Sequence, residues 1–231
     1  MTFSIAGRCE RTGMFGVAIT TSSIAVTSRC PWARAGVGAV STQNVTDPSI
    51  GPRTLDAMEK GASAPDALQK VMAESAHAEY RQVIAIDRRG ATAFHGGAKT
   101  LGTHAIHPGQ DCIAAGNLLR NANVPKAMVR SFEANGAVHL AERLLRALEE
   151  GVVAGGELGP VHSGGLIVVR DRIWPLVDLR VDWDDVAPIA HLRQLWDAYE
   201  PQMEAYQTRA VDPGSAPAYG VPGDPGSSPK R

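Results

Sequence analysis

Met1-Thr2-Phe3-Ser4-Ile5-Ala6-Gly7-Arg8-Cys9 opens the chain, with a hydroxyl residue behind the first methionine and an alternation of apolar and small residues behind that. The alternation predicts a buried strand. If Met1 is removed, Thr2 gains a free α-amine, and a threonine hydroxyl beside its own N-terminal amine is a recognised unit of nucleophile and base. Many proteins begin with Met-Thr, so the rest of the chain has to decide whether this start carries an activity.

Further strands and helices are predicted from the period of the apolar residues and from turn residues. Hairpins are expected over 2–9 with 15–22, 81–87 with 91–95 and 164–169 with 173–179, and single strands over 36–43 and 112–117. Helices are expected over 52–60, 64–72, 125–133, 137–148 and 188–207. Hairpins separated by pairs of helices favour antiparallel sheets with separate helical layers over βαβ units. The sequence therefore predicts an α+β fold, a four-layer αββα sandwich of two antiparallel sheets flanked by helices.

One domain accounts for most of the 231 residues, because 44% hydrophobic residues are enough to fill a substantial core. We expect this domain over residues 1–185, followed by an amphipathic helix over 186–207 that packs on it or on a second copy of the chain. The composition changes to Pro, Gly, Ser and Asp over 208–231. Such a segment cannot bury enough apolar surface to order itself, so we expect a disordered tail.

Charge and cysteine content restrict the partners of the chain. The formal net charge is -1 and the basic residues are scattered, so neither nucleic acid nor an anionic membrane is an expected partner. A small-molecule substrate and a homodimer formed through the C-terminal helix are expected instead. Three widely spaced cysteines fit neither a disulfide framework nor a Cys-rich zinc site. Without a signal segment or an apolar run of about 18 residues, the sequence indicates a cytoplasmic protein.

Uncharged polar side chains gather where two predicted central strands end. They are Ser41, Thr42, Gln43 and Asn44 after the first strand, and Asn117 after the second. Such residues have two explanations: they cap a strand end or form a turn, or they contact a substrate. Arg81, at the start of another strand, fits a substrate carboxylate through its guanidinium fork, or a solvated or paired surface position.

Several short motifs resemble a bacterial and archaeal family catalogued as a domain of unknown function, DUF1028. They are Met1-Thr2-Phe3-Ser4-Ile5, Thr12-Gly13 with Gly16-Val17-Ala18, the run from Pro31 to Val40 followed by Thr42-Gln43, Gly51-Pro52-Arg53, Arg81-Gln82, Gly116-Asn117, Ala141-Glu142-Arg143-Leu144-Leu145 and Val177-Asp178-Leu179-Arg180-Val181. The resemblance covers roughly residues 2–195. That family is grouped with the N-terminal nucleophile (Ntn) hydrolases, which include proteasome subunits and several amidases. The resemblance implies the αββα sandwich and, less directly, hydrolysis of an amide bond.

The resemblance also implies roles for individual residues. Thr2, once exposed, is the expected nucleophile, with its α-amine as the base. The side chains and backbone amides near Ser41, Thr42 and Gln43 are expected to stabilise the oxyanion, and Asn117 supplies a further donor. Asn44 and Arg81 are expected to line the substrate site.

Ser22 and Ser23 lie at the end of the second strand, where related hydrolases often carry a residue that orients the amine. Neither residue is a carboxylate, and no lysine occurs in the strand region that follows. This departure from the proteasome pattern leaves two alternatives: a small-amide hydrolase, or a catalytically silent protein of the same fold that binds a small ligand or a partner protein. If Thr2 is blocked, Ser4 is the nearest other hydroxyl.

A metal-dependent hydrolase is a third alternative. His104 and His107 have a spacing that suits two ligands of one metal ion. Pro108-Gly109 follows, however, and no nearby carboxylate or cysteine completes the set. The sequence therefore favours a site without metal.

Overall fold

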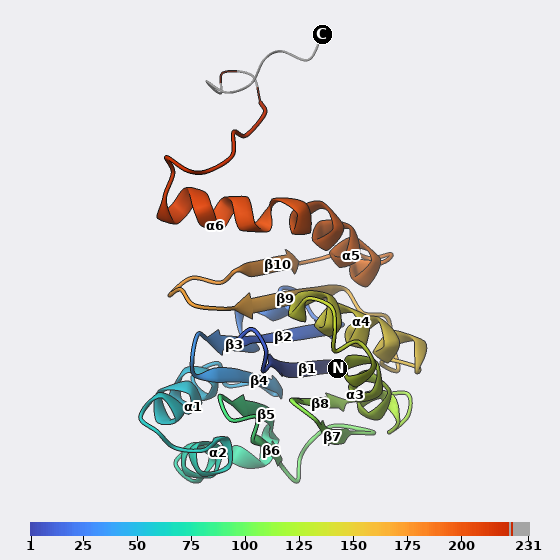
Figure 1. The fold of residues 1–231 in the computed structure, drawn as a ribbon. Coiled ribbons are helices and arrows are strands. Elements are labelled where there is room, and N and C mark those ends of the chain that lie inside the picture. Colours follow the sequence, from blue (N-terminus) through green and yellow to red (C-terminus); the bar gives the residue numbers. More distant parts are fainter. Residues whose placement is uncertain (222, 224–231) are drawn as a thin grey trace.

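The strands form two antiparallel sheets that pack face to face (Figure 1). The computed structural model describes residues 1–221 and residue 223. The larger sheet has the order β10-β9-β2-β1-β8-β7, made by β10 (Val177–Val181), β9 (Ser163–Val169), β2 (Met14–Thr21), β1 (Thr2–Cys9), β8 (Cys112–Asn117) and β7 (Ala105–Gly109). The smaller sheet has the order β3-β4-β5-β6, made by β3 (Pro31–Arg34), β4 (Gly38–Asn44), β5 (Arg81–Asp87) and β6 (Thr92–Gly96).

Helices cover the outer face of each sheet (Figure 1). The smaller sheet carries α1 (Ile50–Glu59) and α2 (Ala64–Ala73), and the larger sheet carries α3 (Val124–Ala134) and α4 (Leu140–Val153). Two more helices follow, α5 (Pro188–Tyr199) and α6 (Met203–Val211), and the 3-10 helices are η1 (Val26–Ser28), η2 (Ala78–Tyr80) and η3 (Glu200–Gln202). The arrangement is a four-layer αββα sandwich, so the predicted fold class is confirmed.

Strand β1 lies inside the larger sheet and is buried on both faces, which explains its mixture of apolar and small residues. Phe3 and Ile5 belong to the apolar cluster beneath α3 and α4, whereas Ala6 faces the apolar layer between the sheets. Gly7 is required by close packing, since a Cβ atom there would lie 2.7 Å from the ring of Phe132 on α3. Packing on both faces fixes the strand that begins with Thr2.

Strands β3 and β7 are not predicted by the sequence pattern. Both are short edge strands that contain a proline, Pro31 in β3 and Pro108 in β7. An edge tolerates proline because one side of the strand needs no backbone donor, but the residue weakens the sequence signal. The start of β10 is also later than expected, at Val177, because the fully exposed Ile173 lies in the preceding loop.

The C-terminal helices pack on their own chain. Leu192 and Trp196 of α5 are completely buried, α5 contacts β9 and β10, and Trp196 Nε1 donates to Glu142 Oε2 on α4 at 2.8 Å. This apolar face is therefore occupied within the chain. Helix α6 continues to Val211, past the predicted boundary at 207, and an ion pair of 2.7 Å between Arg170 and Glu204 ties it to the loop after β9. The predicted tail falls partly on residues 222 and 224–231, which lie outside the described residues.

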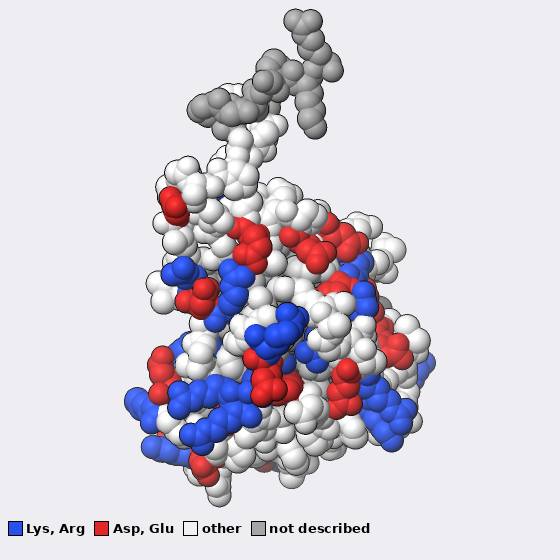
Figure 2. Space-filling model, in the orientation of Figure 1, with Lys and Arg blue, Asp and Glu red and all other residues white. Residues whose placement is uncertain are grey.

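Charged side chains of both signs are interspersed over the face shown in Figure 2. Several form ion pairs, such as Arg34 with Asp56 at 2.8 Å and with Glu59 at 2.7 Å. Exposed pairs of this kind add little to stability. Within the described part of the chain, no helix combines the length and apolar character needed to cross a membrane.

Candidate active site

Strand register places Thr2 between two polar residues of neighbouring strands. Thr2 lies opposite Thr21 of β2 on one side and opposite Asn117 of β8 on the other, and Thr21 lies opposite Ser163 of β9. Residues that are directly opposite point to the same face of a sheet. Ser4, two residues along β1 from Thr2, bonds to the smaller sheet, so this polar row faces the space between the sheets.

The hydroxyl groups of Thr2 and Thr21 hold the acyl group of Met1. Thr2 Oγ1 lies 3.0 Å from Thr21 Oγ1 and donates to the Met1 carbonyl oxygen at 2.6 Å. Thr21 Oγ1 donates to the same oxygen in a short hydrogen bond. With Met1 in place, Thr2 is only 6% exposed. Removal of Met1 would therefore both create the amine and uncover the hydroxyl.

A buried network of side-chain amides lies behind this row. Ser4 Oγ donates to Gln43 Oε1 at 2.7 Å, and Gln43 Nε2 donates to Gln82 Oε1 at 2.8 Å. Asn117 Nδ2 donates to the same Gln82 oxygen at 3.1 Å, and Gln82 Nε2 donates to the Gly116 carbonyl at 3.0 Å. The network joins the two sheets and fixes Asn117 beside Thr2. Ser4 is completely buried and its hydroxyl proton is engaged, so it is a poor substitute nucleophile.

The structure does not bring every predicted residue to this cluster. Thr42 alternates with Gln43 along β4, so it points to the other face of the sheet, where its hydroxyl lies 3.0 Å from Thr46 Oγ1. Ser41 shares the face of Gln43 and is completely buried, and its hydroxyl has no hydrogen-bond partner in the described part of the chain. The alternation explains why three consecutive residues cannot all face one site.

Asn44 and Arg81 hold loops in place. The Asn44 side chain donates to the Tyr80 carbonyl at 2.6 Å and accepts from the Leu101 backbone amide at 3.2 Å. Arg81 Nη1 donates to the Val45 carbonyl at 2.6 Å. These contacts engage both side chains without a substrate, although Arg81 Nε has no hydrogen-bond partner among the described residues.

Ser22 and Ser23 follow Thr21 directly after the end of β2. Ser23 Oγ lies 3.4 Å from Thr21 Oγ1 and accepts from Arg29 Nη2 at 2.6 Å. Ser22 is half-buried. Its backbone amide acts to lower the pKa of a carboxyl group that comes from a distant part of the chain. That carboxyl group belongs to Glu157.

Glu157 lies in the loop between α4 and β9 and turns inward. It is 3% exposed, and its backbone forms an isolated bridge with Leu119. Neither carboxyl oxygen has a hydrogen-bond partner among the described residues. Burial raises the pKa of Glu157 to about 8, while the Met1 α-ammonium and the Ser22 backbone amide act to lower it. The site thus contains a buried carboxyl group, although neither Ser22 nor Ser23 supplies one.

Sequence reasoning missed Thr21, Gln82, Ser163 and Glu157. Thr21 directly precedes the predicted Ser22, so strand pairing alone would have found it. Glu157 gave one weak signal, an acidic residue behind Gly155-Gly156, and both glycines have positive φ angles of 123° and 57°. These conformations suit glycine and turn the loop back toward β1.

The described residues contain no group of three or more His, Cys, Asp and Glu side chains that could hold a metal ion. His104 is exposed, and its Nδ1 lies 2.9 Å from the Gly102 carbonyl oxygen.

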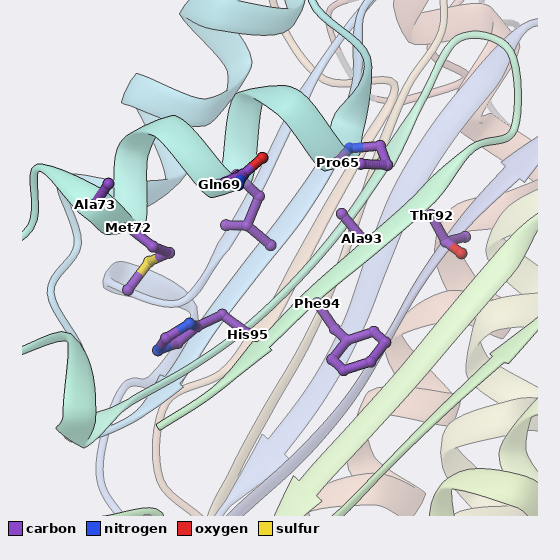
Figure 3. Close-up of a pocket in the computed structure, with 9 residues that line it drawn as sticks. Pro65, Gln69, Met72, Ala73, Thr92, Ala93, Phe94 and His95 are labelled. Carbon is purple, nitrogen blue, oxygen red and sulfur yellow. The ribbon is translucent and has the colours of Figure 1, made fainter. Parts of the chain in front are cut away.

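A separate cavity of about 570 Å³ opens between α2 and β6 (Figure 3). Its walls include Met72 of α2 and Phe94 of β6. Thr92 and His95 also line it, but they are three residues apart on β6 and therefore point to opposite faces of the strand. His95 Nε2 lies 2.8 Å from the Ala78 carbonyl oxygen. No nucleophile and base are paired here, so the cluster around Thr2 is the better candidate.

The fold and this cluster define an αββα sandwich in which a threonine is the first residue of a central strand. The chain belongs to a family of unknown function, DUF1028, whose model matches residues 2–192. The resemblance to that family is thereby confirmed.

One solved structure supports the fold. The protein SPO2555 from Silicibacter pomeroyi, described as a DUF1028 protein, has a TM-score of 0.80 and 29% identity, covering 86% of this chain and 85% of its own. Anbu (ancestral beta-subunit) from Yersinia bercovieri has a TM-score of 0.41 and 10% identity, covering 88% of this chain and 96% of its own. A likeness at that level carries no argument about function. Among curated proteins, none matches the chain.

Proposed function

We propose that this protein is an amidohydrolase of the N-terminal nucleophile type that cleaves a small amide or related C–N bond. The observation that carries the proposal is the position of the Thr2 hydroxyl, 2.6 Å from the carbonyl oxygen of an acyl group that Thr21 also holds. A nucleophile and a hydrogen-bond donor thus already converge on one carbonyl group. The site needs no metal ion and no organic cofactor.

The reaction starts once Met1 has been removed. The Thr2 α-amine takes the proton of Oγ1, and Oγ1 attacks the substrate carbonyl carbon. The Thr21 hydroxyl donates to the developing oxyanion, and Asn117, fixed by Gln82 and Gln43, lines the other side. The leaving nitrogen takes the proton from the Thr2 ammonium as the C–N bond breaks. Water then hydrolyses the ester on Thr2 and restores the free hydroxyl.

The remaining predicted residues take different places in this proposal. Ser22 and Ser23 follow Thr21 after the end of β2, and Ser41 lies in the buried layer between the sheets. Thr42, Asn44 and Arg81 drop out of the mechanism because each is engaged elsewhere. We further propose that the protein acts in the cytoplasm, where a reducing environment suits its three free, buried cysteines.

The test begins with the mass of the N-terminus in protein purified from cells. Protein that begins with Thr2 is then incubated with a panel of small amides, beside the variants Thr2→Ala and Thr2→Ser. We expect hydrolysis by the wild type, partial activity of Thr2→Ser and none of Thr2→Ala. A protein that retains Met1 and shows activity unaffected by Thr2→Ala would overturn the Thr2 mechanism.

A silent binding protein is the second candidate function. It is favoured by the tight packing of Met1, whose acyl group covers Thr2 and whose ammonium acts on Glu157. Retention of Met1 together with measurable ligand binding and no turnover would support this candidate. A homodimer remains part of either proposal, and light scattering of the full chain tests it.

A further inference from the structure

We infer that the substrate is an α-aminoacyl amide, and that its α-ammonium pairs with the buried carboxyl group of Glu157. The inference rests on the proposed function and names its substrate class. It makes Glu157 the residue that selects substrates with a free amino group.

Met1 serves as a template for the acyl part of the substrate. Its carbonyl oxygen lies 2.6 Å from Thr2 Oγ1 and accepts from Thr21 as well. An acyl group attached to Thr2 Oγ1 therefore occupies nearly the same volume as the methionyl group attached to the Thr2 nitrogen. Removal of Met1 leaves a space next to the nucleophile that already fits an aminoacyl group.

The acceptor for the substrate α-ammonium is the carboxyl group of Glu157. This carboxyl group is 3% exposed and has no hydrogen-bond partner within the described part of the chain. The positive charge of the Met1 α-ammonium acts to lower the pKa of this carboxyl group, but within the described residues the two groups form no hydrogen bond. Burying a carboxyl group without a partner is costly, and a charge pair gains strength in a buried site. Once Met1 has left, the site has a buried acceptor that a substrate ammonium would satisfy.

The side chain of Met1 packs against the loop that carries Glu157. The Met1 thioether lies against Gly159, where a Cβ atom would stand 3.2 Å from the methionine Cε. Gly159 thus lies against the side chain of the residue whose carbonyl group is at Thr2, and Glu157 is two residues earlier in the same loop. The carbonyl group and the side chain of an α-aminoacyl group thus each have a defined place, and Glu157 offers a buried acceptor for its amine.

The reaction is a simple hydrolysis. Methioninamide and water give methionine and ammonia through an ester between the methionyl group and Thr2 Oγ1. The C–N bond of the amide breaks and the nitrogen leaves with the proton that the Thr2 amine took from Oγ1. No oxidant, reductant or co-reactant other than water is needed.

The experiment compares L-methioninamide with N-acetyl-L-methioninamide, which lacks the ammonium charge. Protein that begins with Thr2 is obtained from cells or by cleavage of a removable leader ahead of Thr2. Ammonia release gives kcat/KM, and calorimetric titration of the Thr2→Ala variant gives binding without turnover. We expect the free amine to be preferred by about 10- to 100-fold, the size of a charge-assisted hydrogen bond. Glu157→Gln should lower kcat/KM for the free amine by about this factor relative to the N-acetyl substrate and so remove the preference.

The outcomes separate this inference from the proposed function. Turnover of both amides at equal rates overturns the aminoacyl specificity and leaves the hydrolase intact. An equal loss for both amides in Glu157→Gln would show that the carboxyl group serves the Thr2 amine instead, which also overturns the inference. Binding of the free amine that depends on Glu157, without turnover, supports the ammonium site and overturns the hydrolase. Absence of both binding and turnover overturns both, provided that circular dichroism shows a folded protein.

Discussion

Ser4 Oγ on β1 donates a hydrogen bond of 2.7 Å to Gln43 Oε1 on β4, and this bond joins the two sheets two residues behind Thr2. Gln43 continues the connection to Gln82, which also accepts from Asn117. The position of Asn117 beside Thr2 therefore depends on the smaller sheet as well as on the larger one. The polar layer between the sheets acts as a support for the site.

Replacing Ser4 by alanine should weaken this support. The substitution leaves the buried Gln43 Oε1 without its partner, which costs about 1–3 kcal/mol of unfolding free energy. Urea denaturation of Ser4→Ala measures the loss. A double-mutant cycle with Gln43→Met provides the control, since the effect of Ser4→Ala should shrink when Gln43 is already absent. Equal effects in both backgrounds would contradict the coupling.

Replacing Thr21 by valine should reduce catalysis without unfolding the protein. Valine keeps the shape of threonine but removes the hydroxyl that donates to the carbonyl oxygen. Loss of such a donor costs about 10²- to 10³-fold in kcat. Thr42→Val is the matched control, because Thr42 is equally buried but faces away from the site. Similar losses in both variants would contradict the assigned register of the active face.

The fold is largely readable from the sequence because alternation, turn residues and helical spacing agree with one another. The start of the central strand at Thr2 and the polar end of a second strand at Asn117 follow from the same pattern. Their pairing does not, because the register joins residues more than a hundred positions apart in the chain. Sequence pattern shows that a strand has two faces but not which face meets which neighbour, so Thr42 and Gln43 were expected in one site.

Glu157 could not be predicted for a different reason. Its loop has no period, and its position depends on two glycines with positive φ angles and on one bridge to Leu119. The sequence contains many glutamates, and burial distinguishes this one from the others. Neither Ser22 nor Ser23 carries a carboxyl group, as the sequence shows. The carboxyl group on which the N-terminal charge acts belongs to Glu157, which comes from another part of the chain.

Glu157→Gln should change how stability depends on pH. Burial raises the folded-state pKa of Glu157 from 4.5 to about 8, so its contribution to stability is fully present below pH 4.5 and is lost as pH rises through 8. Glutamine does not titrate. Relative to the wild type, the melting temperature of the variant should therefore rise between pH 5 and pH 9. The rise should correspond to at least about 1 kcal/mol of unfolding free energy. Exposed Glu150→Gln is the control, and an unchanged difference across this range would contradict the burial of an ionisable carboxyl group.

Gly159→Val should alter which side chains the site accepts. A Cβ atom added at Gly159 would lie 3.2 Å from the Met1 Cε, so the two methyl groups of valine would enter the space of a methionyl side chain. The backbone of Gly159 does not have a positive φ angle, so valine fits the local conformation. We expect kcat/KM for methioninamide to fall by about 10-fold or more while glycinamide, which has no side chain, is hydrolysed as by the wild type. An equal fall for both amides would mean that the loop itself is displaced, and no change for either would mean that the methionine template does not describe the substrate.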